Sequence, residues 1–235
     1  MTPATHILEV WGDLACFTRP EMKVERFSYP VITPSAARAI FDAIYYKPKF
    51  RWQITQIDVL REPAYIALRR NETKEKTNTN AVNRWMRGGD IQPIFTDVDR
   101  ESAGTDQKGR TQRQTMALKN VHYMLYAQAL TWSGTDADQM AVDAQFRRRA
   151  ARGQCIYQPY LGCREFPAYF ELREDVPDQT PDINIDIGWM LYDVFDLSRP
   201  GSSDSPACIS LFRAEVSRGT LLVPSYLSDL VHKVS

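Results

Sequence analysis

The sequence contains few of the residues from which metal sites and disulfide frameworks are built. It has only 4 cysteines and 3 histidines in 235 residues. Cys155 and Cys163 are eight positions apart, which does not match the spacing of a zinc site. A Gly-rich phosphate loop and a nucleophile elbow are also missing. We therefore expect free thiols, no metal site and no cofactor.

Long apolar segments are missing as well. No apolar run approaches the ~20 residues that a membrane-spanning helix needs, and residues 1–10 lack the basic and apolar regions of a signal peptide. The composition, 43% hydrophobic and 25% charged, is that of a globular protein and excludes disorder of the whole chain. We expect a cytoplasmic protein that has no membrane partner and is monomeric when isolated.

The formal net charge is zero, whereas free-standing nucleic-acid-binding domains are usually basic. The charge is unevenly distributed, however. Residues 69–119 contain 11 Lys or Arg against 7 Asp or Glu, and residues 145–173 contain 6 against 2. Residues 174–204 contain 8 acidic residues against a single arginine. Because binding to phosphate depends on the local field, a basic surface on this neutral protein can still bind nucleic acid.

Hydrophobic periodicity predicts an α+β fold. Thr33 can cap a helix that has Pro34 at its first position and ends near Tyr46, because Pro48 follows. A second helix is expected over residues 136–152, with Gly153 as its stop signal. Alternation of polar and apolar residues predicts strands at 6–11, at 50–60 with a bulge near Gln56, at 118–132 and at 166–172.

The resulting order, βαββαβ, is that of the ferredoxin-like arrangement, which RNA-recognition (RRM-like) domains also use. We expect this domain to cover residues 1–173, with a polar and mobile insertion at about 69–113. Residues 174–235 are expected to form an acidic linker and a small C-terminal antiparallel β-sheet. Its strands are predicted at 186–195, 207–216 and 220–223. The fold class alone does not assign a function.

Residues 146–166 carry the clearest indication of function. Guanidiniums at a helix C-terminus oppose its negative dipole and match phosphate oxygens, and tyrosines in the following loop can stack on bases. Glycines there let the main chain approach a ligand closely. The residues concerned are Arg147, Arg148, Arg149, Arg152, Gly153, Tyr157, Tyr160, Gly162 and Arg164. The alternative is a solvated helix end followed by a structural loop with buried tyrosines.

Several separated motifs, in this order, together resemble the fifth CRISPR-associated protein family, subtype I-C. They are VWGD at 10–13, CFTRPE at 16–21, IYYKP at 44–48, RRNE at 69–72, FRRR at 146–149 and YLGCREF at 160–166. The resemblance spans roughly residues 7–223. It implies a ferredoxin-like domain of the RAMP type followed by a C-terminal sheet.

The resemblance also implies an activity and partners. Members of the family cut the repeat of the CRISPR precursor transcript without a metal ion and then hold the 5′ tag of the guide RNA. The implied partners are the CRISPR repeat RNA, the guide RNA, and the backbone and large subunits of the type I-C interference complex. A small-molecule enzyme or a regulatory ferredoxin-like domain is a further alternative, for which the sequence contains no motif.

Metal-free RNA cleavage needs a base near the ribose 2′-hydroxyl, an acid for the leaving 5′-oxygen and cations for the phosphorane. The resemblance assigns a catalytic role to the tyrosine at the end of the first helix, which is Tyr45 here. Tyr46 and Lys47 follow it and are expected to contact RNA. The other reading of Tyr45 is that it only packs the helix end.

The Lys-His pair of the family is not matched, because Met140-Ala141-Val142 occupy that place. Three explanations remain open. His122 can replace the pair, with Lys119 three residues away, although a regular strand would turn the two to opposite faces. Cleavage can instead depend on Tyr45 with nearby cations, namely Lys47, Arg147 and Arg148. Finally, the protein can have lost cleavage and only bind the tag. We favour retained cleavage.

Overall fold

The structure is a computed structural model that describes residues 3–74, 76–91, 110–135, 138–175, 180–201 and 206–234. The chain forms two compact units. Residues 67–115 make the smaller unit, and residues 1–66 and 116–235 make the larger one. Two strands, β4 (Ala64–Thr73) and β5 (Arg110–Thr131), contribute residues to both units.

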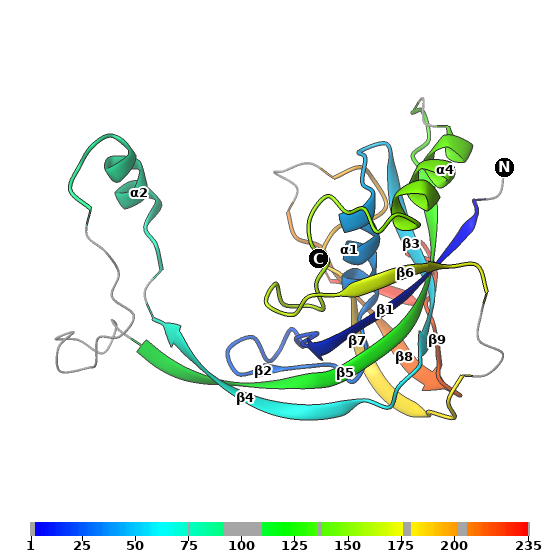
Figure 1. Cartoon of the computed structure of the whole chain (residues 1–235), viewed down its shortest axis with the longest axis horizontal. Helices are drawn as coiled ribbons and strands as arrows, with labels where there is room; N and C mark the ends of the chain where they lie inside the picture. Colours follow the sequence, from blue (N-terminus) through cyan, green and yellow to red (C-terminus); the bar gives the residue numbers. More distant parts are fainter. Residues whose placement is uncertain are drawn as a thin grey trace. The chain divides into compact units, whose positions relative to one another are not determined.

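The larger unit is built on an antiparallel sheet (Figure 1). Its main path has the strand order β10-β8-β9-β3-β5-β1-β6, and β2 and β7 pair with β5 and β8. The strands are β1 (Thr5–Ala15), β2 (Arg26–Phe27), β3 (Phe50–Val59), β6 (Tyr169–Arg173), β7 (Ile185–Asp193), β8 (Ile209–Ser217), β9 (Thr220–Leu222) and β10 (Val231–Val234), together with β5. Figure 1 shows helices α1 (Pro34–Ile44) and α4 (Gln139–Ala150) on one side of β1 and β5.

The first helix follows the sequence prediction closely. Thr33 caps α1 and accepts a hydrogen bond from the Ala36 amide at 3.3 Å. Apolar residues at helical spacing, among them Ile40 and Phe41, are buried against the sheet. The helix ends at Ile44, because Tyr45 is extended, with φ of −152°. The predicted start and type of this helix are confirmed, and its end lies slightly earlier than expected.

Helix α4 and the sheet also confirm most of the predicted elements. Asp138 caps α4, and Gly153 has φ of +62°, the left-handed geometry that commonly ends a helix. The start expected at 136 lies outside the described residues. The predicted bulge in β3 is present between Ile54 and Gln56. The fourth predicted strand begins only at Tyr169, since the residues before it form a turn closed by the Leu161 amide and the Phe166 carbonyl at 2.8 Å.

The C-terminal strands differ from the expectation in one respect. The predicted strands at 186–195, 207–216 and 220–223 are confirmed as β7, β8 and β9, and they are antiparallel. They do not form a separate sheet, because β9 pairs with β3 and continues the main sheet. Periodicity did not indicate the short strands β2 and β10. The division of the chain at residue 173 stays a prediction.

The smaller unit contains structure that the sequence did not predict. It includes the ends of β4 and β5 and the helix α2 (Thr79–Met86), whose cap is Asn78. Arg113 on β5 lies 3.5 Å from the Glu72 carboxylate on β4. The expected polar insertion thus contains regular elements at both of its ends, while residues 92–109 lie outside the described part.

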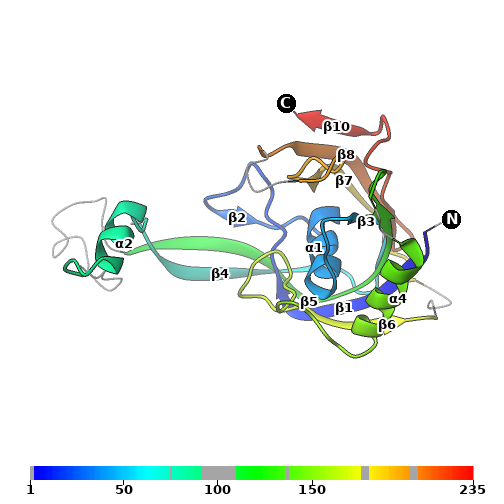
Figure 2. The same cartoon turned by 90° about the horizontal axis from the view of Figure 1, so that it is seen from above.

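The core of the larger unit is centred on Trp52, which is fully buried. Its ring lies 4.6 Å from that of Phe146 on α4, 5.1 Å from that of Phe41 on α1 and 5.7 Å from that of His6 on β1. Phe50 completes the cluster. Each fully buried side chain of this size contributes roughly 1.5–3 kcal/mol. The cluster therefore fixes both helices on the sheet, side by side as seen in Figure 2.

An ion cluster attaches α1 to the C-terminal strands. Arg38 on α1 lies 2.7 Å from the Asp193 carboxylate at the end of β7 and 2.5 Å from Asp42. Asp193 is almost fully buried and also accepts bonds from the Val194 and Phe195 amides. Because removing one partner of such a buried cluster leaves an unpaired charge, its members depend on one another.

All four cysteines are free, as predicted. In the part of the chain that the structure describes, no helix is long and apolar enough to cross a membrane.

A buried histidine makes the stability of the fold depend on pH. His6 Nε2 lies 2.8 Å from the Asp143 carboxylate on α4. Burial lowers the pKa of His6 below its ordinary value of 6.5, and the hydrogen bond to Asp143 opposes that shift only partly. The histidine is therefore neutral in the folded protein at neutral pH.

We predict that the neutral His6 contributes stability above pH 6.5 that is lost as the pH falls through this value, because the unfolded chain then binds a proton that the folded chain does not. Urea denaturation of wild type and His6→Gln between pH 8 and 5 measures this. The free energy of unfolding of the wild type should fall more steeply with acidification. Parallel curves would contradict the prediction, since the other titrating groups are common to both proteins.

Candidate nucleic-acid interface

The C-terminal ends of α1 and α4 lie together. Arg149 of α4 donates a hydrogen bond from Nε to the Ile44 carbonyl at 2.7 Å. The Ile156 amide, in the loop after α4, donates to the Ala43 carbonyl at 2.6 Å. The last turn of α1 has no basic residue of its own, so Arg149 supplies the cation that its carbonyls favour. The two helix ends and the loop therefore form one surface.

Tyr45 occupies the centre of this surface. Its carbonyl accepts a hydrogen bond from the Trp52 indole at 3.0 Å, which ties its main chain to the core. Its ring is half-buried and lies 5.4 Å from that of Phe50. Tyr46 and Lys47 follow it and are exposed. The ring contact supports a packing role for Tyr45, and the partial exposure leaves its edge accessible to a ligand.

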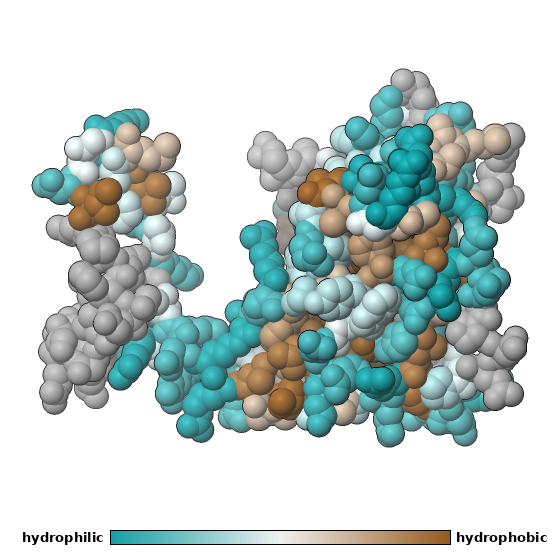
Figure 3. All heavy atoms as spheres, in the orientation of Figure 1, coloured by the Kyte–Doolittle hydropathy of each residue, from teal (hydrophilic) through white to brown (hydrophobic). Residues whose placement is uncertain are grey.

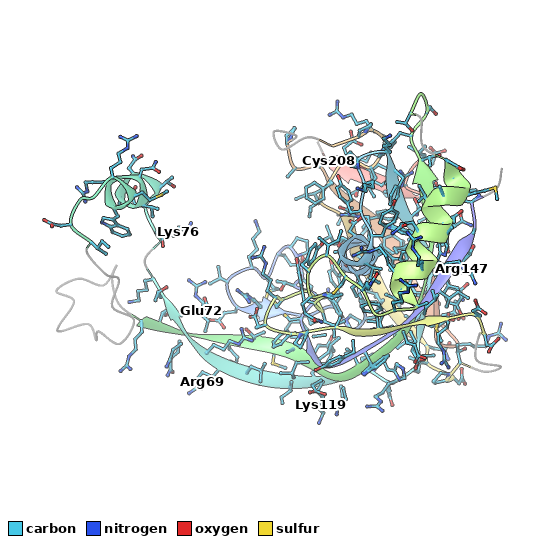
Figure 4. All side chains as sticks on the ribbon, turned by 45° about the horizontal axis from the view of Figure 1, so that its top comes forward. Arg69, Glu72, Lys76, Lys119, Arg147 and Cys208 are labelled. Carbon is cyan, nitrogen blue, oxygen red and sulfur yellow. The ribbon has the colours of Figure 1, made fainter. Side chains whose placement is uncertain are left out.

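The four arginines predicted to bind phosphate have different environments. Arg147 and Arg148 are exposed on α4, where they bond to the side chains of Glu174 and Gln145. Arg152 is exposed just beyond the helix. Arg149 is half-buried, and its bond to Ile44 gives it a structural role that the sequence did not indicate. Figure 3 shows strongly hydrophilic surface over α4, and Figure 4 shows Arg147 on that helix.

The loop after α4 combines structural glycines with accessible rings. Gly162 has φ of +81°, and a Cβ there would lie 2.1 Å from the Cys16 carbonyl oxygen. Gly162 is therefore required by the close approach of the Cys16 main chain and not by an approach to RNA. A Cβ at Gly153 would meet nothing within 4 Å. Glycine is favoured at this position by its positive φ and not by a lack of space. Tyr157 is 48% exposed, Tyr160 is half-buried and Arg164 is exposed.

Sequence reasoning missed an acidic group beside this surface. Asp42 lies one turn before Tyr45 on α1 and is paired with Arg38. Burial raises the pKa of the Asp42 carboxyl to about 6, the charge of Asp193 adds to the shift, and Arg38 opposes it. Desolvation and then the negative charge of Asp42 raise the pKa of Tyr157. The Arg38–Asp42 spacing of i,i+4 was visible in the sequence, but the burial was not.

His122 and Lys119 are not part of this surface. Trp52, which holds Tyr45, pairs with Ala129 on β5. His122 is seven residues away along the same strand. At about 3.4 Å per residue, the two positions on β5 are separated by roughly 24 Å. The structure therefore does not bring His122 or Lys119 together with Tyr45, and Figure 4 shows Lys119 and Arg147 in well separated places.

The surroundings of His122 are also different from those expected. Its Nε2 lies 2.7 Å from the Glu9 carboxylate on β1. Asn120, one of the two residues between these candidates, has φ of +51°. Because this residue interrupts the regular strand, the alternation argument does not decide which way Lys119 points. Among the described residues, no hydrogen bond or ion pair joins Lys119 to His122, and no group of three or more His, Cys, Asp or Glu could hold a metal ion.

Comparisons with known proteins give consistent results. Residues 5–224 match the family described as CRISPR-associated protein (Cas_Cas5). A curated relative from Mannheimia succiniciproducens, named CRISPR pre-crRNA endoribonuclease Cas5d, is 39% identical, and the match covers 96% of this chain and 97% of the relative. A protein of the same name from Thermus thermophilus is 38% identical, with 93% and 90% covered.

A solved structure shares the fold. It is titled "Crystal Structure of CRISPR-associated Protein", and it matches 98% of this chain and 97% of its own with a TM-score of 0.64 and 19% identity. The mixed α/β architecture with a large antiparallel sheet is therefore one that a known CRISPR-associated protein also has.

The different environments of the arginines generate a stability prediction. Arg149→Ala removes the charged donor from the Ile44 carbonyl and should lower the free energy of unfolding by about 1–3 kcal/mol. Arg148→Ala removes an exposed side chain of the same type from the same turn and should change it by less than about 0.5 kcal/mol. Chemical denaturation of both variants checks this. Equal changes in the free energy of unfolding would show that the bond from Arg149 to the Ile44 carbonyl does not stabilise the fold.

Proposed function

Because the chain belongs to the CRISPR-associated Cas5 family, we propose that it is an endoribonuclease that cuts the repeat of the CRISPR precursor transcript. We further propose that it then retains the 5′ tag of the guide RNA, next to the backbone and large subunits of a type I-C interference complex. The names of its two curated relatives support the first part. This activity would place the protein in the cytoplasm, where the transcript is made.

The observation that carries the proposal is the meeting of the α1 and α4 ends. Arg149 joins the end of α4 to Ile44, the residue before Tyr45, and three exposed guanidiniums stand in the same segment, from Arg147, Arg148 and Arg152. Guanidiniums suit phosphate oxygens, and the exposed ring of Tyr157 can stack on a base. Local positive charge supports RNA binding although the net charge of the chain is zero.

The proposed reaction needs no metal ion. The ribose 2′-oxygen attacks the adjacent phosphorus, its proton passes to a base, and the 5′-oxygen leaves with a proton from an acid. The products are a 2′,3′-cyclic phosphate and a 5′-hydroxyl. The Tyr45 hydroxyl is proposed to take part in one proton transfer, while Lys47 and the arginines stabilise the charge of the phosphorane.

The partner of Tyr45 in proton transfer is best sought near it. The separation of roughly 24 Å along β5 between His122 and the position that pairs with Trp52 argues against His122 and Lys119 as its acid or base partners, because proton transfer requires contact or a single bridging water. Asp42 lies on α1 beside Tyr45, and its pKa of about 6 lets it exchange a proton near neutral pH. It is therefore the next residue to test.

The strand order of the sheet supports a more specific description of the fold. We infer that β1, α1, β3, β5, α4 and β6 form a ferredoxin-like unit. The antiparallel order β3-β5-β1-β6 supports this, since the two outer strands flank the first and third strands of the set. The C-terminal strands would then be an extension added at the edge β3.

A second candidate function is a scaffold that binds the tag without cutting it. One observation favours it: Met140, 62% exposed on α4, and its neighbours stand where the family resemblance leads one to expect a Lys-His pair. Binding with and without cleavage requires the same basic surface, so only an activity assay separates the two candidates.

We predict that Tyr45→Phe lowers the single-turnover rate of repeat cleavage roughly 10²-fold or more while RNA affinity changes little, as is typical when an acid–base group is lost. The substitution keeps the ring against Phe50 and removes only the hydroxyl. Quenched-flow cleavage of labelled repeat RNA measures the rate, and EDTA should leave it unchanged. Asp42→Asn and His122→Ala serve as comparison variants. Intact repeat RNA at every pH from 6 to 9, with tight binding retained, would establish the scaffold function instead.

We also predict that changing both Arg148 and Arg152 to Ala weakens binding to repeat RNA and lowers the magnitude of its salt slope by about 1.4–1.8, because each phosphate contact contributes about 0.7–0.9. Arg149 is left intact since its loss would disturb the helix ends. Affinity is measured by fluorescence anisotropy at several salt concentrations, with a thermal melt as the folding control. An unchanged slope would show that Arg148 and Arg152 do not contact RNA phosphates.

A further inference from the structure

The sheet of the larger unit has a second face that carries exposed aromatic residues. Along β1, side chains alternate between the two faces. Leu8 and Val10 are fully buried on the face that packs against the helices. Glu9 and Trp11 point to the opposite face, where Trp11 is 38% exposed. A contiguous patch of exposed apolar side chains on a protein surface commonly marks a binding site.

Trp11 is the middle of a row of rings that crosses three strands. It pairs directly with Tyr169 on β6 and with His122 on β5, strands that lie on either side of β1 in Figure 1. The rings of Trp11 and Tyr169 are nearly parallel, with centroids 6.2 Å apart. The His122 ring meets Trp11 edge-on at 6.3 Å. Tyr169 is 51% exposed, and the His122 side chain 30%.

We propose that this row, Tyr169–Trp11–His122, is a stacking platform for unpaired nucleotides of the RNA substrate. The inference rests on the proposed function and adds a second RNA-contacting surface, distinct from the ends of α1 and α4. Every base has a π-face, and stacking on aromatic side chains is a general means of holding single-stranded RNA.

Two arginines lie beside the row, among the carboxylates of Glu9, Asp13 and Glu171. Arg61 is exposed, and its bond to the Asn120 carbonyl at 3.4 Å holds it beside one end of the row. Arg173 on β6 lies 3.1 Å from Glu9 and 3.7 Å from Glu171. Cations beside an aromatic row can bind the phosphates of a strand that crosses it.

The acidic residues of this face can accept hydrogen bonds from RNA bases. Glu9 is held between His122 at 2.7 Å and Arg173 at 3.1 Å, so its charge is compensated. Asp13 is exposed next to the row. A carboxylate accepts hydrogen bonds from the exocyclic amines of bases, which a stacked, unpaired base presents on its Watson–Crick edge. The surface thus offers rings for stacking, cations for phosphate and an acceptor for amino groups.

The face is also hollowed at this position. A pocket of about 300 Å³ lies beside Trp11, and its wall includes Glu9, Asp13, Arg61 and His122. The pocket leaves open space beside Trp11.

The test uses full-length protein and two RNAs, the labelled repeat RNA and a short unstructured RNA of mixed sequence. Trp11→Ala and Tyr169→Ala should each weaken binding of the unstructured RNA roughly 5- to 150-fold, the range expected for one lost base stack. Trp11→Phe keeps a ring and should retain most of the affinity. Trp189→Ala, which removes a 50% exposed tryptophan on β7, is the matched control and should bind as wild type.

A second measurement does not depend on the folding of any variant. Wild-type protein is photo-crosslinked to repeat RNA that carries 4-thiouridine at its unpaired positions, and the crosslinked peptides are identified by mass spectrometry. Crosslinks to the peptides that contain Trp11 or Tyr169 support the platform. Crosslinks confined to residues 146–164 overturn it.

The remaining outcomes separate the two proposals. Wild-type affinity in both alanine variants overturns the platform and leaves the proposed endoribonuclease untouched. Unchanged RNA affinity combined with failed assembly into the interference complex would show that the row binds a protein, which also overturns the inference. If wild-type protein binds repeat RNA without cutting it, the proposed cleavage is overturned and the platform is not. Wild-type protein that binds neither RNA overturns both.

Discussion

The burial of Trp52 is the interaction on which the rest of the larger unit depends. Its indole contacts rings from α1, α4 and β1, so one side chain fixes both helices on the sheet. The same indole donates its N–H to the Tyr45 carbonyl, so the core also determines where α1 ends. A large, fully buried ring in a close-packed interior allows little displacement of its neighbours. The candidate site is thereby built on a rigid support, although its own residues lie in loops and at helix ends.

This support brings two negative helix ends together, which is unfavourable unless cations compensate them. Arg149 provides that compensation for α1, and the other arginines are left facing solvent. A group of arginines that is uniform in the sequence thus divides into one structural residue and three accessible ones. The pKa of about 6 for Asp42 has a similar origin, because the packing that positions Arg38 also removes Asp42 from water. Electrostatic features of the site follow from the burial of its neighbours.

Local signals in the sequence predicted the local structure well. Thr33 and Pro34 marked the start of α1, Gly153 marked the end of α4, and the interrupted alternation near Gln56 marked the bulge. What the sequence could not give was the register and neighbour order of the strands. These decide that His122 lies far from Tyr45 along β5 and next to Trp11 on β1. Periodicity describes which way a side chain points, but it contains no information about which strand lies beside it.

The direct pairing of Trp11 with His122 has a consequence for folding specificity. If β1 slipped by one residue against β5, every side chain would change faces, and Leu8 and Val10 would enter water while Glu9 entered the core. Burying an unpaired carboxylate and exposing two core residues are both costly, so the misaligned pairing is strongly disfavoured. The core therefore selects the alignment by itself. The same slip would turn Trp11 toward the core, so the burial of Leu8 and Val10 also keeps the ring at position 11 on the outer face.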